Sequence, residues 1–368
     1  MDLFLDLFSN VWAFTWQQGV MIAIGCILVY LAIAKEMEPT LLLPMGFGAI
    51  LVNLPGVDAI AIENLANFGL SHELGELFPL LLFIGIGAMI DFGPLLSNPK
   101  MFLFGGAAQF GIFFTLVVAT LLGFSLTDAA CVGIIAAADG PTSIYVSEVF
   151  DSSYKGAIMV AAYSYMALVP IIQPPIIKLI TTKRERQIRM EYTPSNVSKA
   201  TRIIFPVVVT IIAAAVAPKS AELIGFLMFG NLIRECGVLD SLSQTAQREL
   251  ANLITILLGI SVSFSMKAED FVQWKTLMIL GLGLVGFVFD TVGGVFFAKF
   301  LNLFSKKKVN PMIGAAGISA FPMASRMVHK MGQDEDPYNF LLMHAAGANV
   351  SGQIASVIAG GLILSLVG

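Results

Sequence analysis

Long apolar stretches alternate with short polar segments along the whole chain. Several of them carry no charged residue and are long enough for a transmembrane helix, which needs about 20 apolar residues. We interpret as membrane-spanning helices residues 19–34, 41–54, 77–90, 101–123, 156–180, 203–217, 223–233, 253–264, 276–303 and 338–367. The pattern therefore predicts an all-α, polytopic membrane protein.

The composition agrees with this interpretation and narrows the function. Of 368 residues, 57% are hydrophobic and 12% are charged, which excludes an ordinary soluble domain. The formal net charge of −4 is small and spread out, so no nucleic-acid partner is indicated. The three cysteines show neither a disulfide framework nor metal-ligand spacing. No Walker loop, dinucleotide fingerprint or catalytic triad is present, so the chain is not expected to hydrolyse ATP itself.

Charged residues between the apolar stretches indicate the topology. Residues 183–202 form a connector with six basic residues, and the positive-inside rule places it in the cytoplasm. The acidic loop 58–76 contains no Lys or Arg and is placed outside. The two assignments agree only if residues 129–150 enter and leave the membrane on the outer face. The basic residues 306–308 lie in the cytoplasm only if residues 310–329 enter and leave there.

Each half thus has about five transmembrane helices plus one re-entrant helical hairpin. Because each half crosses an odd number of times, the halves are predicted to be inverted repeats. The division is an N-terminal repeat (1–182) with hairpin 129–150, a cytoplasmic connector (183–202), and a C-terminal repeat (203–368) with hairpin 310–329. At one constant offset, residues 51–56 match 232–237 and Pro141 matches Pro322, although chance similarity between two glycine-rich halves is the alternative. Broken segments at corresponding positions point to a binding site between the repeats.

The first hairpin carries Asp139-Gly140-Pro141-Thr142-Ser143 in an apolar background. An ionisable residue inside a membrane is a functional-site hypothesis by default. Gly-Pro breaks a helix, and the freed carbonyls with the Asp, Thr and Ser oxygens suit a dehydrated Na⁺. The alternative is that Asp139 only caps the helix that follows. We interpret Asp139 as the ligand of a transported cation.

Other polar residues in the apolar segments are weaker candidates. Tyr163 and Tyr165 are two positions apart and do not share a helix face, so a common site would need a distorted helix; packing is the alternative. Arg326 is either an anchor at the cytoplasmic surface or a receptor for a carboxylate. Asn349 either contributes an amide oxygen to a binding site or forms a polar contact between two helices. Asp290 is the weakest functional candidate.

These residues also carry a family resemblance. The segments Ala-Ala-Asp139-Gly-Pro-Thr, Asn310-Pro-Met-Ile-Gly314-Ala-Ala-Gly-Ile-Ser319 and Asn349-Val-Ser-Gly resemble the β subunit of biotin-dependent, sodium-translocating carboxylic acid decarboxylases. The likeness covers nearly the whole chain. Members of this family serve oxaloacetate, methylmalonyl-CoA or glutaconyl-CoA decarboxylase complexes.

The resemblance implies an activity and assigns residues to it. It implies that Asp139, Asn310, Ser319 and Asn349 bind sodium, and that Tyr163 and Tyr165 lie near the ion and proton path. It implies that Arg326 and Gly314 belong to the carboxybiotin site, and that Arg326 lies close to the carboxybiotin. The implied activity is decarboxylation of carboxybiotin, with consumption of a proton and export of Na⁺.

The resemblance also implies partners and a location. The carboxybiotin would be carried on a biotin carrier subunit, and the other implied partners are a carboxyltransferase α subunit and a small membrane γ or δ subunit. The expected location is the inner (cytoplasmic) membrane, in contact with lipid, as a homo-oligomer. The residues alone also allow a secondary sodium-coupled transporter of a small organic anion, or a membrane anchor that transports nothing.

Overall fold

The computed structural model describes residues 14–36, 39–70, 77–192 and 197–368. In these residues the regular elements are all helical, which confirms the predicted all-α membrane fold. Part of the acidic loop, including Glu73 and Glu76, lies outside the described residues. The α-helices are α3 Trp16–Ala34, α4 Pro39–Val52, α5 Ile60–Leu70, α6 Leu77–Met89, α7 Gly93–Ser97, α8 Phe102–Ala107, α9 Phe110–Leu121, α10 Leu126–Ile134, α11 Gly140–Val149, α12 Lys155–Ile180, α13 Lys183–Arg186, α14 Lys199–Val216, α15 Ala221–Glu235, α16 Asp240–Thr245, α17 Ala251–Phe264, α18 Ala268–Phe271, α19 Trp274–Phe304, α20 Met312–Ala315, α21 Met323–Glu335 and α22 Leu342–Val367.

Each predicted span coincides with helix, and two of them differ in detail from the prediction. Six stretches of the described chain are long and apolar enough to cross a membrane. The predicted span 101–123 is interrupted between α8 and α9, at Ala108 and Gln109. The predicted span 338–367 begins as helix only at Leu342. Helix α17 is short, but it continues from α16 through a π-helical turn, Ala246–Leu250, without a break.

The helices pack in reciprocal pairs across the two halves. Helix α4 lies against α17, and α6 lies against α15. Likewise α12 packs on α19 while α22 packs on α8, and each of α12 and α22 follows a broken segment that it contacts. Small residues allow this closeness, as expected for helices in lipid. A Cβ on Gly87 of α6 would lie 1.8 Å from the carbonyl oxygen of Leu227, so the two backbones touch there.

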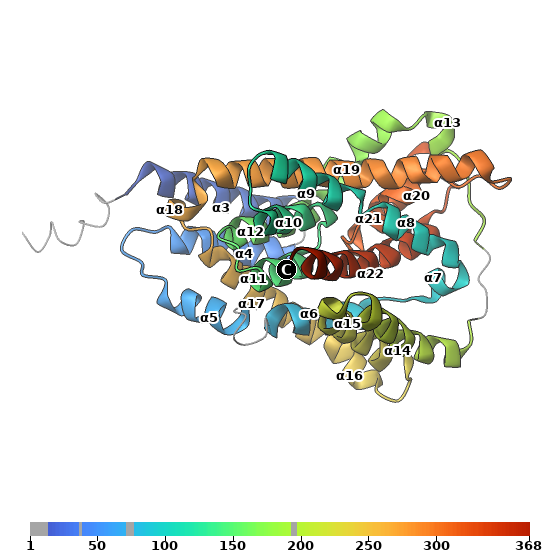
Figure 1. The fold of residues 1–368 in the computed structure, drawn as a ribbon, viewed down its shortest axis with the longest axis horizontal. Coiled ribbons are helices and arrows are strands. Elements are labelled where there is room, and N and C mark those ends of the chain that lie inside the picture. The colour runs from blue at the N-terminus through green and yellow to red at the C-terminus, as the bar shows by residue number, and fades with distance from the viewer. Residues whose placement is uncertain (1–13, 37–38, 71–76, 193–196) are drawn as a thin grey trace, which may run out of the picture.

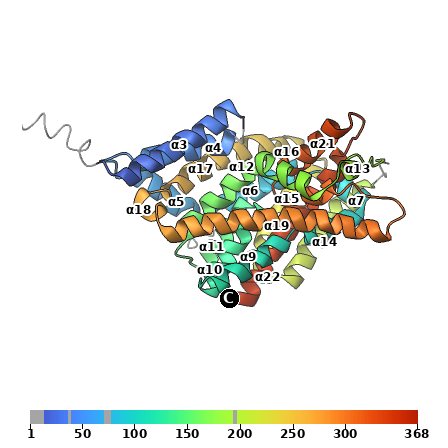
Figure 2. The same cartoon turned by 90° about the horizontal axis from the view of Figure 1, so that it is seen from above.

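Helix α19 runs along the length of the molecule and borders both broken segments (Figure 1). Figure 2, turned by 90°, shows α19 crossing in front of α12 and α9. The C-terminus of α22 lies beside α10 and α11 (Figures 1 and 2). The break in each segment is thereby held in the interior by long helices.

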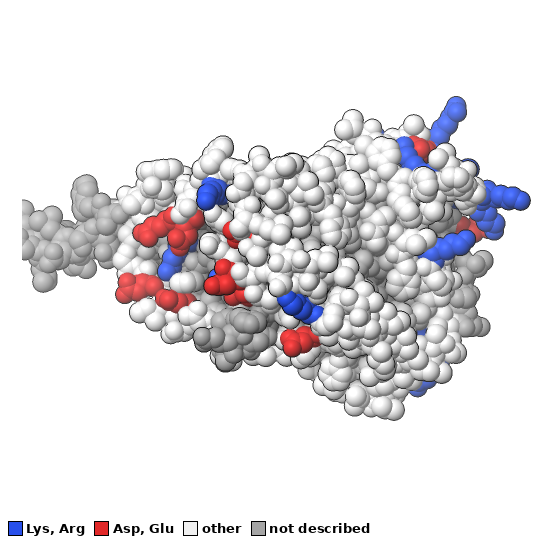
Figure 3. Space-filling model, in the orientation of Figure 1, with Lys and Arg blue, Asp and Glu red and all other residues white. Residues whose placement is uncertain are grey.

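Opposite charges gather at opposite ends of the molecule (Figure 3). Acidic residues lie at the end with α5 and α18, which carry Glu63, Glu269 and Asp270. Lys and Arg cluster at the other end, where α13 carries Lys183, Arg184 and Arg186. On the face shown in Figure 3, few charged side chains lie between the ends, as expected for a belt in contact with lipid.

Candidate functional site

The segment 126–149 folds back on itself. Helix α10 passes into a 3₁₀ turn, η3 (Ile135–Ala137), and the chain reverses at Ala138, which is left-handed with φ 50°. Asp139 is extended and caps α11, whose first turn holds Pro141 where its missing N–H costs nothing. The two ends of the segment meet, because the Ser152 hydroxyl donates to the Asp128 carboxylate at 2.7 Å. Asp139 therefore lies at the inner tip of a folded-back segment.

The segment 310–335 folds back from the opposite end of the molecule. At its start, Asn310 Nδ2 donates to the connector carbonyls of Arg186 (2.8 Å) and Ile188 (2.9 Å). At its end, Glu335 pairs with Arg186 at 2.6 Å. Both ends are therefore tied to the basic connector, and the tip at residues 316–322 points into the interior.

The ion pair between Arg189 and Asp336, which lies next to these contacts with the connector, depends on pH. Hydrogen bonds from Arg189 lower the pKa of Asp336 below its usual range. A carboxyl group whose pKa is lowered in the folded state stabilises that state above its unfolded pKa, and the contribution is lost as the pH falls through the lowered pKa. The contact is thus intact at neutral pH.

The two tips meet beside α22. The backbone N–H of Ser319 donates to the carbonyl of Ala137 at 3.2 Å, which joins one tip to the other. Helix α22 approaches both tips at glycines. A Cβ on Gly352 would lie 2.1 Å from the Gly317 oxygen, and one on Gly360 would lie 2.8 Å from the Thr142 methyl group. The contact between the tips is therefore covered by the middle of α22.

The Asp139 carboxylate lies at this junction and is 2% exposed. One oxygen accepts the N–H of Thr142 at 3.2 Å. The other accepts the Ser356 hydroxyl at 2.6 Å and the Gln353 amide at 3.3 Å, both from α22. The Thr142 and Ser319 hydroxyls lie beside the same carboxylate. All its partners are uncharged.

Three further oxygens near the junction are buried without a hydrogen-bond partner: Thr142 Oγ1, Asn349 Oδ1 and Tyr163 Oη. Asn349 uses its amide N–H on the Ile318 carbonyl (2.7 Å), which leaves Oδ1 free to accept. The Tyr163 ring lies against Gly140, where a Cβ would be 2.3 Å from Cε1. Buried oxygens without donors are costly unless a ligand satisfies them. One carboxylate among neutral oxygens is a donor set that suits a monovalent hard cation.

The structure does not bring every predicted residue to this junction. Asn310 lies at the connector, where its amide N–H groups are used and its Oδ1 accepts the N–H of Met312. Tyr165 points to α19 and donates to the Leu280 carbonyl, away from Tyr163 on the same regular helix. Gly314 packs on Gly294 of α19. Arg326 is exposed in the first turn of α21, with no ion-pair partner among the described residues.

Two residues of the junction, Gln353 and Ser356, were not identified as site residues from the sequence. Together with Asn349 they occupy positions i, i+4 and i+7 of α22, which share one helix face. A polar stripe with this spacing on an otherwise apolar helix was the signal that could have identified them. Their side chains reach Asp139, which lies more than half of the chain away in sequence.

We expect the Ser356→Ala variant to bind sodium about tenfold more weakly, because a hydrogen bond to a charged group contributes ~1.5–3 kcal/mol. The measurement is the sodium concentration that gives half-maximal activity of the complex. Ser365→Ala is the matched control, since the Ser365 hydroxyl donates only to the Gly361 carbonyl of the same helix. Equal sodium affinities in the two variants would contradict the assignment of Ser356 to the site.

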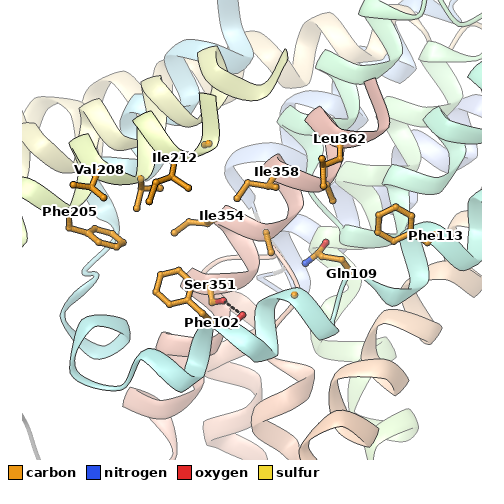
Figure 4. Close-up of a pocket in the computed structure, with 15 residues that line it drawn as sticks. Phe102, Gln109, Phe113, Phe205, Val208, Ile212, Ser351, Ile354, Ile358 and Leu362 are labelled. Carbon is orange, nitrogen blue, oxygen red and sulfur yellow. Dashed lines mark hydrogen bonds between the residues drawn. The ribbon is translucent and has the colours of Figure 1, made fainter. Parts of the chain in front are cut away.

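A separate apolar groove of about 550 Å³ lies between α14, α22 and the α8–α9 break (Figure 4). Its walls include Phe102, Phe205, Ile212 and Ile354, and Gln109 points into it. None of the junction's oxygen donors lines the groove. The site therefore lies not in this groove but in the interior between the tips.

Comparison with known proteins decides the family. The family model for the Na⁺-transporting oxaloacetate decarboxylase beta subunit matches residues 17–367. The chain belongs to this family. The resemblance inferred from the sequence motifs is thereby confirmed.

Relatives with three different names match almost end to end. The glutaconyl-CoA decarboxylase subunit beta of Acidaminococcus fermentans is 49% identical, covering 98% of this chain and 96% of its own length. The methylmalonyl-CoA decarboxylase subunit beta of Propionigenium modestum is 46% identical, covering all of both chains. The probable oxaloacetate decarboxylase beta chain of Vibrio cholerae is 45% identical, covering 96% of each. The similar identities do not favour one acid substrate over another.

Proposed function

We propose that the chain is the membrane subunit of a biotin-dependent decarboxylase, in which decarboxylation of carboxybiotin drives Na⁺ export. Membership of the family of Na⁺-transporting beta subunits supports the transported ion. The observation that carries the proposal is the Asp139 carboxylate, buried at the junction of two broken segments among neutral oxygen donors.

The proposed sodium site consists of Asp139 and the neutral oxygens around it. One carboxylate and one Na⁺ sum to zero charge, so the loaded site can be buried at less cost than the empty one. The side-chain oxygens that we assign to the ion are those of Asp139, Thr142, Ser319, Asn349, Gln353 and Ser356. Asn310 is left out because its side chain is engaged with the connector. We assign Tyr163, whose hydroxyl is buried and unpartnered, to the edge of the same site.

Transport needs two states that expose the site to opposite sides. We propose that residues 1–182 and 203–368 are inverted repeats that rock against each other, joined by the connector 183–202 and carrying hairpins 129–150 and 310–329. The reciprocal packing of α4 on α17 and α6 on α15 supports a two-fold relation. Moving one charge against 100 mV costs about 2.3 kcal/mol, which the energy of decarboxylation would supply.

Arg326 is the proposed contact for carboxybiotin. Its guanidinium is exposed, lies on the hairpin that is tied to the basic end, and forms no ion pair among the described residues. A guanidinium can hold a carboxylate through two parallel hydrogen bonds. Decarboxylation breaks the bond between the biotin nitrogen and the carboxyl carbon; the electron pair stays on nitrogen, which takes up a proton, and CO₂ leaves. Gly314 would support this hairpin through its contact with α19 rather than touch the cofactor.

A beta subunit works in a multisubunit assembly. The partners that we propose are a biotin carrier, a carboxyltransferase α subunit and a small membrane subunit, with assembly as a homo-oligomer in the inner membrane. The basic end of the molecule, with α13, would face the cytoplasm and receive the carrier.

The test is uptake of radioactive sodium into inverted vesicles that contain the purified complex, started by the acid substrate, with and without avidin. Avidin sequesters biotin, so the proposal predicts that uptake stops when avidin is added. Uptake that continues with avidin, or by the isolated chain without a biotinylated partner, would instead indicate a secondary transporter. Decarboxylation without any sodium uptake would indicate a membrane anchor.

A further inference from the structure

A second carboxylate is buried in the membrane part of the fold, away from the sodium junction. Asp290 lies in the middle of α19 and is 0% exposed. It faces the break between α8 and α9, where one of its oxygens accepts the N–H of Gly111 in the first turn of α9. The N–H of Ile112 also lies against this carboxylate. Its other oxygen, Oδ2, accepts no hydrogen bond within the usual geometry from the described residues. A buried carboxylate thus lies beside a broken helix for the second time, here with one oxygen unpartnered.

Asp290 lies between the two broken segments along α19. One turn before it, Gly286 packs against η3 of the first segment, with a Cβ there only 2.8 Å from that of Ala136. One turn after it, Gly294 touches the second segment, where a Cβ would lie 2.1 Å from the Gly314 oxygen. Any movement of the two segments relative to α19 would therefore change the surroundings of Asp290.

Capping of α9 does not by itself explain a carboxylate here. An asparagine oxygen would accept the same N–H without placing a charge in the membrane, which is costly. No ion pair of Asp290 occurs among the described residues. The elements packed here, α8, α9, η3 and α20, contain no titratable side chain.

Titratable groups on the remaining neighbouring elements contact residues other than Asp290. On α12, Lys155 pairs with Glu148 and Asp151, and the Tyr163 ring lies against Gly140. On the same helix, the Tyr165 hydroxyl donates to the Leu280 carbonyl. On α10, Cys131 faces the Val146 carbonyl, and Asp128 accepts from Ser125 and Ser152. Further along α19, Lys299 pairs with Glu185 at 3.0 Å. Asp290 is therefore without a charged partner in this region.

Two threonine hydroxyl groups are buried near Asp290 along α19. Toward the acidic end, the Thr115 hydroxyl has no partner and lies 2.1 Å from where a Cβ on Gly286 would be. Toward the basic end, the Thr291 hydroxyl accepts the Gln173 amide at 3.0 Å. Both threonines are at most 1% exposed. Two buried hydroxyl groups thus lie within about one turn of Asp290 along α19.

We propose that Asp290 is a second ion-carrying site, which takes up and releases the proton that decarboxylation consumes. This inference rests on the proposed function, because the proton is the one that the biotin nitrogen takes up when CO₂ leaves. The carboxyl group accepts the proton on Oδ2, the oxygen without a partner, while its other oxygen stays on Gly111.

The test uses the complete complex in proteoliposomes and the variant Asp290→Asn, which keeps an acceptor for the Gly111 N–H. We expect turnover to fall about a hundredfold, the range that a lost proton-transfer group produces. The sodium concentration for half-maximal activity should stay within about twofold of wild type, because Asn does not touch the sodium junction. In Asp290→Ala, which leaves room for a small acid, added formate should restore part of the turnover, and equal chloride should not.

Two outcomes would overturn the proposal. Wild-type turnover in Asp290→Asn would make Asp290 a helix cap only. Slow turnover with a changed sodium requirement and no rescue by formate would make its role structural. Failure of the proposed function is seen separately and earlier, as wild-type complex whose sodium uptake is not stopped by avidin.

Discussion

Asp139→Asn is expected to abolish sodium transport and the stimulation of decarboxylation by sodium. The asparagine oxygen can still accept the Thr142 N–H, so the cap of α11 survives. The negative charge is lost, and all the other oxygens that we propose as ligands of the ion are neutral. Two unit charges at 4 Å interact by about 4 kcal/mol at an effective dielectric constant of 20, which corresponds to a roughly thousandfold loss of sodium affinity.

The measurement is sodium uptake together with decarboxylation as a function of sodium concentration, in the same vesicles. Asp151→Asn is the control, because this carboxylate is exposed and pairs only with Lys155 at the surface. It should leave both curves unchanged. If Asp139→Asn retained coupled transport, the carboxylate would serve only as the cap of α11, and the sodium site would have to be sought elsewhere.

The broken segments were predictable because charge and hydropathy act over long stretches of chain. Each additional crossing would have moved the six basic connector residues to the wrong side of the membrane, and this excluded a simple span at 129–150. Asp139 and Ser319 were identifiable for a related reason. A carboxylate or a hydroxyl next to a helix break in an apolar segment has few other uses.

The partners of Asp139 depend on how helices rotate against each other, and local sequence does not determine that. Gln353 and Ser356 meet the carboxylate because the glycines of α22 let it approach both tips. The side chains of Tyr163 and Tyr165 point in different directions because α12 remains a continuous helix through its prolines. The motif containing Asn310 begins at the basic connector, one arm of the folded-back segment away from Ser319. Residues that are close together within one sequence motif thus lie at different places in the fold.

Gly294→Ala is expected to displace the second broken segment. At this position α19 and the second broken segment touch backbone to backbone, and an added methyl carbon would lie 2.1 Å from the Gly314 oxygen. Backbone cannot move aside as a side chain can, so the segment must shift. Overpacking of this kind costs about 1–3 kcal/mol, and the shift would also displace Ser319 from the junction. We therefore expect sodium affinity and thermal stability to fall together.

Gly281→Ala is the matched control, because it lies on the same helix and an added Cβ there has nothing within 4 Å. The two variants change helix propensity equally, since both replace Gly with Ala within a helix. Any difference between them therefore reports the contact at Gly314. Thermal unfolding of the detergent-solubilised complex and the sodium dependence of decarboxylation measure the two effects. If Gly294→Ala were as stable and as sodium-sensitive as Gly281→Ala, the second segment would have to slide along α19 without cost. Such a freely sliding segment could not hold Ser319 against Ala137, and a sodium site made where two tips meet would lose its physical basis.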